Sequence, residues 1–157
     1  MDYQPISLNL AVQIAILASA LFLLIGMWTG VWKYLQIRKS PSARAHYYVD
    51  IAHRSALLYA PACLIIAVLC FFSILPEWLL LVCAGANLLF FLASVLSYII
   101  HGMLKDTSNQ FLKPHRLGKF QLPAFLISGF MWALMVAELG ATTLLSLGTL
   151  LYFFNLG

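Results

Sequence analysis

The sequence predicts an all-α integral membrane protein, folded as a bundle of four transmembrane helices in a single domain over residues 1–157. Hydrophobic residues make up 63% of the chain and charged residues only 9%, and the mean hydropathy is +0.94. A water-soluble fold needs more polar side chain than this to cover its surface. Four apolar runs are each long enough to cross a hydrocarbon core of about 30 Å, which takes roughly 20 helical residues.

We expect the four helices over residues 8–35, 46–75, 78–104 and 121–155. The apolar runs are continuous and do not alternate with polar residues at period two, which excludes the pattern of a membrane barrel strand. The helical bundle is therefore the fold that these runs favour.

The fourth run carries an acidic residue, Glu138, near its middle. Small residues recur beside it at every fourth position, namely Gly129, Ala133, Ala137 and Ala141. Such a ridge favours close packing between helices, within one chain or between chains. From this ridge we expect a homo-oligomer, a trimer.

Basic residues gather in two of the expected connections. Four follow the first run and four follow the third: Lys33, Arg38, Lys39 and Arg44, then Lys105, Lys113, Arg116 and Lys119. Because lysine and arginine mark cytoplasmic loops, we expect both termini on the periplasmic side of a bacterial inner membrane. The positive charge suits contact with the lipid bilayer and does not imply nucleic acid.

The segment HYYVDIAHRSALLYAP, residues 46–61, places ionisable residues at the start of the second run. On a helix, His46, Asp50 and His53 lie within about 60° of one another, and Arg54 follows Asp50 by four residues. Asp50 and Arg54 can therefore form an ion pair near the membrane boundary, or belong to a site there.

The third run carries a second polar stripe, spaced by three and four residues, that contains Asn87, Ser94, Tyr98 and His101. The second run starts, and the third ends, on the same side of the membrane, so His53 and His101 should lie at similar depth. Neutral imidazole binds haem iron and other metal ions. We expect a shared site here, with a cofactor held by ligands among His46, His53 and His101, or a metal ion by His53, His101 and Asp50.

Two short segments, SPSARAH at 40–46 and GANLLFF at 85–91, are similar to styrene oxide isomerase, a family of haem b membrane proteins. The resemblance implies an iron ligand at His46, or at His53 after a shift, and an active-site asparagine at Asn87. The family's active-site tyrosine falls on Phe91, so Tyr59 or Tyr98 takes its place. The iron then acts as a Lewis acid on an epoxide oxygen.

Residues 51–69, IAHRSALLYAPACLIIAVL, resemble the second helix of the membrane-associated eicosanoid and glutathione metabolism proteins at Arg54, Tyr59 and Pro61. That resemblance implies glutathione as co-substrate and a trimer. The family's glutathione-binding asparagine and glutamate fall on Ser55 and Leu58, which leaves Arg54 to hold an anionic ligand.

Three functions stay open. The first is an isomerase-like enzyme with a histidine-ligated cofactor that acts on a small lipophilic ligand, with catalytic residues among Tyr59, Asn87, Tyr98 and Arg54. The second is a glutathione- or lipid-dependent transferase. The third is a non-catalytic accessory subunit of a larger membrane complex, whose polar stripes hold helices together.

Overall fold

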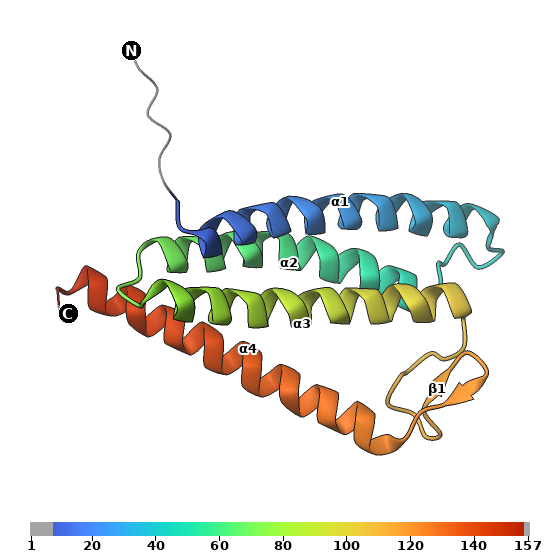
Figure 1. Cartoon of the computed structure of the whole chain (residues 1–157). Coiled ribbons are helices and arrows are strands. Elements are labelled where there is room, and N and C mark those ends of the chain that lie inside the picture. The colour runs from blue at the N-terminus through green and yellow to red at the C-terminus, as the bar shows by residue number, and fades with distance from the viewer. Residues whose placement is uncertain (1–7, 156–157) are drawn as a thin grey trace, which may run out of the picture.

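The computed structural model describes residues 8–155, which form four long antiparallel helices (Figure 1). These are α1 (Leu10–Lys39), α2 (Tyr47–Phe71), α3 (Glu77–Leu104) and α4 (Ala124–Phe153). All four are long and apolar enough to cross a membrane. The all-helical fold with four candidate spans is thus confirmed.

The helix ends agree with the expected bounds to within four residues, and the largest differences are at the ends of α1 and α2. Helix α1 continues to Lys39 because its last turn carries Arg38 and Lys39, and cations are favourable at a helix C-terminus. Helix α2 begins after His46, whose imidazole accepts a hydrogen bond from the Tyr48 N–H. His46 is therefore a helix cap, which places it outside the helix.

The core lies between α1, α2 and α3, and α1 and α2 form the most extensive helix pair. Small buried residues allow the close approach of these two helices, among them Ala11, Ala15, Ala52 and Ala56. On the other side of α2, the ring of Tyr59 stacks on Phe91 of α3 with centroids 4.2 Å apart. Helix α2 thus presents different faces to α1 and α3.

Helix α4 has buried residues only in its C-terminal half, and it diverges from α3 towards its N-terminal end (Figure 1). Its buried residues are Ala141, Leu145, Gly148 and Thr149. The Thr149 hydroxyl donates to the Leu69 carbonyl at 3.0 Å, which ties α4 to α2. Of the predicted small-residue ridge only Ala141 is buried, so the trimer stays a prediction.

The connection between α3 and α4 is ordered and contains a short hairpin of β1 (Arg116–Leu117) and β2 (Phe120–Gln121). Gly118 supplies the positive φ, 60°, that the turn between the strands requires. This connection and the one between α1 and α2 lie at the same end of the bundle (Figure 1), so the two basic segments share one side. The chain ends themselves, residues 1–7 and 156–157, lie outside the described residues.

Candidate functional site

The polar stripe of α2 faces α1. The Asp50 carboxylate pairs with Lys33 of α1 and with Arg54, each at 2.6 Å, so the predicted Asp50–Arg54 pair is confirmed. The His53 Nδ1 atom lies 2.8 Å from the Gly26 carbonyl oxygen of α1. These contacts join α1 to α2.

The polar stripe of α3 has different neighbours. The His101 Nδ1 atom lies 2.8 Å from the Asp106 carboxylate in the α3–α4 connection, and the ring of Tyr48 packs beside the imidazole at 5.0 Å. In the structure, His53 and Asp50 thus contact α1, whereas His101 contacts the α3–α4 connection, and a metal ion shared by these three residues stays a prediction. Asp50 and His53 lie on the side of α2 that faces α1, whereas Tyr48 packs against His101 of α3. Within residues 8–155, no three His, Cys, Asp or Glu side chains lie close enough to hold one metal ion.

The histidines differ in how well they fit a haem iron. The His46 Nδ1 atom accepts a hydrogen bond from the Tyr48 N–H at 3.4 Å, so the neutral His46 imidazole carries its proton on Nε2. That proton occupies the nitrogen that would have to bind iron. The His53 Nδ1 donates to a carbonyl, which leaves a lone pair on Nε2. However, the His53 ring is packed on Gly30, where an added Cβ would lie 2.9 Å from Cε1. The tautomer of His53 fits a metal ligand, but His53 lines none of the five cavities described for residues 8–155.

Two adjoining cavities, of about 210 and 290 Å³, lie between α3, the N-terminal half of α4 and the α3–α4 connection. They share four lining residues, and we call them together the α3–α4 cleft. Their polar lining comprises Tyr59, Ser94, Ser97, Tyr98, His101 and Gln110. Helix α4 supplies an apolar wall that includes Ile127, Phe130 and Met131. The cleft is thus a largely apolar space with a few polar groups, as is usual for small-molecule sites.

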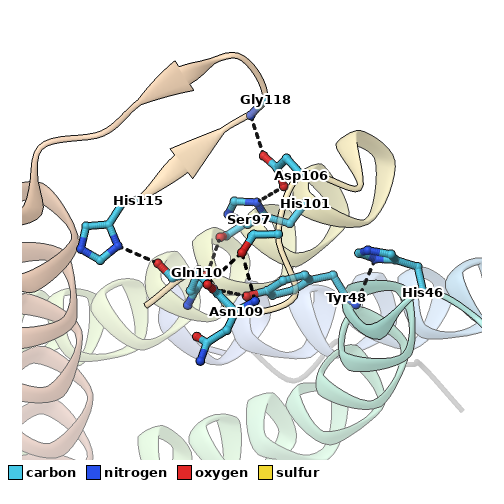
Figure 2. A network of polar contacts seen from close by, with 10 residues as sticks. His46, Tyr48, Ser97, His101, Asp106, Asn109, Gln110, His115 and Gly118 are labelled. Atoms are coloured by element: carbon cyan, nitrogen blue, oxygen red, sulfur yellow. Dashed lines mark hydrogen bonds and ion pairs between the residues drawn. The ribbon is translucent and has the colours of Figure 1, made fainter. Parts of the chain in front are cut away.

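His101 and Asp106 form a nearly buried pair at this cleft, with side chains 6% and 5% exposed (Figure 2). The second carboxylate oxygen of Asp106 accepts from the Gly118 N–H in the hairpin turn. Burial alone would raise the pKa of Asp106, but the hydrogen bonds from Gly118 and His101, with the charge of His101, hold it below its ordinary value. An ionised Asp106 fixes the proton of His101 on Nδ1, which leaves Nε2 free to exchange a proton with a ligand.

The connection that carries Asp106 is fixed to the helix ends by further hydrogen bonds (Figure 2). The Gln110 N–H donates to the Tyr48 hydroxyl of α2, and the Ser97 hydroxyl donates to the Gln110 side chain at 3.3 Å. The His115 Nδ1 lies 2.9 Å from the Gln110 carbonyl oxygen. These bonds hold Gln110 in place as one wall of the cleft. The sequence analysis singled out neither Asp106 nor Gln110.

Two of the four predicted catalytic residues line the α3–α4 cleft, and the other two have different partners. Tyr59 and Tyr98 line the cleft together. Asn87, only 1% exposed, instead bonds within and between helices: its amide donates to the Cys83 carbonyl at 3.0 Å, and its oxygen accepts from Thr142 of α4 at 3.1 Å. Asn87 therefore joins α3 to α4. The Arg54 side chain forms an ion pair with Asp50.

Glu138 lies one turn beyond Leu134, which lines the cleft. One of its carboxylate oxygens is buried without a hydrogen-bond partner in the described chain. A buried oxygen of this kind can accept a hydrogen bond from a ligand.

No family model, curated protein or solved structure matches the chain. The two family resemblances therefore stay predictions, and the site is argued from its own geometry.

Proposed function

We propose that the protein is a membrane-embedded enzyme that isomerises a small lipophilic substrate in the α3–α4 cleft. The observation that carries the proposal is the buried His101–Asp106 pair, 2.8 Å between Nδ1 and Oδ1, beside a mostly apolar cavity of about 290 Å³. An imidazole oriented by a carboxylate is a frequent general acid and base in enzymes. The four apolar helices support the membrane setting.

The substrate class follows from the resemblance to styrene oxide isomerase: a lipophilic epoxide. Protonated His101, stabilised by Asp106, gives its Nε2 proton to the epoxide oxygen as the carbon–oxygen bond breaks. A hydride shift to the adjacent carbon forms the carbonyl group, and the proton returns from its oxygen to His101. The reaction needs no co-reactant. The hydroxyls of Tyr59 and Tyr98 are the groups that orient the oxygen.

The apolar wall of the cleft favours a substrate that arrives from the bilayer. Ile127, Phe130 and Met131 come from the N-terminal half of α4, in which no residue is buried. Phe125 and Leu126, on the same half of α4, are exposed, so this half offers apolar surface around the cleft. A lipophilic molecule can therefore leave the bilayer without crossing water.

Photolabelling tests where such a molecule binds. In liposomes, a small aryl diazirine should label the α4 peptide that contains Ile127 and Met131, and an excess of styrene oxide should compete with this labelling. Met131→Trp, which fills the cleft, should abolish the competed label. Met135→Trp, at an exposed position of α4, should keep it. Label that styrene oxide does not displace, or that survives Met131→Trp, contradicts the proposal.

A second candidate function is an isomerase whose cofactor is held by His53, since the hydrogen bond from Nδ1 to Gly26 leaves Nε2 available. Haem iron bound there would supply a Lewis acid for the epoxide oxygen. In that case the purified wild-type protein shows a Soret band that His53→Ala removes. Purified protein with neither a Soret band nor bound metal rules this candidate out.

A further inference from the structure

A cavity of about 630 Å³ lies at the connection end of the bundle, outside the α3–α4 cleft. Three cationic side chains from three separate segments line it: Lys39 at the end of α1, Arg44 in the α1–α2 connection and Lys105 at the end of α3. His46 lines it as well. Residues distant in sequence thus bring positive charge to one cavity.

Within residues 8–155, none of these three cations forms an ion pair. The ion pairs within residues 8–155 join Lys33 and Arg54 to Asp50, and His101 to Asp106, and no carboxylate lines the cavity. Burial lowers the pKa of His46, Lys105 and His101 lower it further, and the charge of Asp106 acts in the opposite direction. An anion bound in the cavity would offset the positive charge of Lys105 beside His46.

The cavity also contains neutral hydrogen-bonding groups and an apolar side. The hydroxyls of Ser40 and Ser42 lie 3.0 Å apart. The backbone N–H of His46 donates to the Gln36 side chain at 2.9 Å, and this bond holds the α1–α2 connection against α1. Trp32 and Leu35 of α1 form the apolar side. Cations, hydroxyls and an adjoining apolar wall suit a phosphate group attached to an apolar molecule.

We infer that this cavity, lined by Lys39, Arg44, His46 and Lys105, binds a phosphate anion, either the headgroup of an anionic phospholipid or free phosphate. The inference is independent of the proposed isomerase, because its residues are not those of the α3–α4 cleft.

Native mass spectrometry of the detergent-purified protein tests it with three probes: dioleoyl phosphatidylglycerol, dioleoyl phosphatidylcholine and inorganic phosphate. We expect phosphatidylglycerol to be retained in preference to phosphatidylcholine. Arg44→Gln with Lys105→Gln should weaken that binding about tenfold or more, because each removes a charged hydrogen-bond donor. The matched control is Lys113→Gln with Lys119→Gln, which removes the same charge from exposed residues outside the cavity.

The probes also separate the two sources of phosphate. Phosphatidylglycerol that inorganic phosphate does not displace indicates a lipid headgroup, whereas retention of inorganic phosphate alone indicates a free anion. Either result supports the cavity as a phosphate site if only the Arg44 and Lys105 variant weakens it. Equal weakening by the control pair, equal retention of phosphatidylcholine, or retention of none of the probes overturns the inference.

Discussion

Replacing Asp106 by asparagine is expected to slow the isomerisation of styrene oxide by about 100- to 10,000-fold, the usual range when general acid–base catalysis is lost. Asparagine can still accept the Gly118 N–H, so the hairpin should stay in place. What is lost is the negative charge that stabilises protonated His101 across the 2.8 Å contact. The measurement is the initial rate of aldehyde formation by purified protein in liposomes.

Asp50→Asn provides the matched control for this substitution. It also removes one carboxylate charge, but Asp50 pairs with Lys33 and Arg54 beside α1, outside the α3–α4 cleft. We expect the rate of Asp50→Asn to stay within about a factor of three of the wild-type rate, as surface ion pairs contribute little to stability. An Asp106→Asn rate equal to that of Asp50→Asn would mean that Asp106 has no part in the reaction.

Gly148→Ala is expected to destabilise the protein by about 1–3 kcal/mol, the usual cost of overpacking. A Cβ at Gly148 would lie 2.2 Å from the Ser73 hydroxyl oxygen and 2.7 Å from Leu75 Cγ, both in the α2–α3 turn. The Gly148 carbonyl also accepts the Ile74 N–H at 3.4 Å. The added methyl group therefore pushes α4 from the bundle at the place where it is anchored, and the thermal unfolding midpoint in detergent should fall.

Gly140→Ala, two turns earlier on α4, is the control for this effect. A Cβ there meets no atom within 4 Å, so the substitution should leave the midpoint unchanged or raise it, because alanine favours helix more than glycine does. Equal midpoints for the two variants would contradict the anchoring of α4 through Gly148. A displaced α4 should also change the shape of the α3–α4 cleft, since α4 forms one of its walls.

The sequence predicted the helices well because their length and continuous apolar character depend on local composition alone. It also predicted which residues share a helix face: Asn87, Ser94 and His101 are all buried on α3, and Asp50 does pair with Arg54. The helical period, however, shows only which residues share one face of a helix. It does not show which neighbouring helix or loop packs against that face. For this reason the spacing did not show that His53 contacts Gly26 of α1 while His101 contacts Asp106 after α3.

The other parts of the candidate site depend on contacts that no helical spacing contains. Asp106 lies five residues after His101, beyond the end of α3, where the chain turns back on the helix. Its place directly after the helix end was the signal that could have identified it. The bond from the Gln110 N–H to Tyr48 spans 62 residues, and the cavity arises only because α4 diverges from α3. Such long-range geometry is set by tertiary packing.

The most direct test of the central claim compares His101→Ala and His53→Ala in the same liposome assay of styrene oxide isomerisation. The wild-type protein should accelerate the reaction, His101→Ala should lower the rate by about 100-fold or more, and His53→Ala should retain most of it. His53 contacts α1 through Gly26, whereas His101 lines the cleft. No acceleration by the wild-type protein, or a rate that His53→Ala abolishes and His101→Ala leaves intact, would contradict the assignment of the reaction to the α3–α4 cleft.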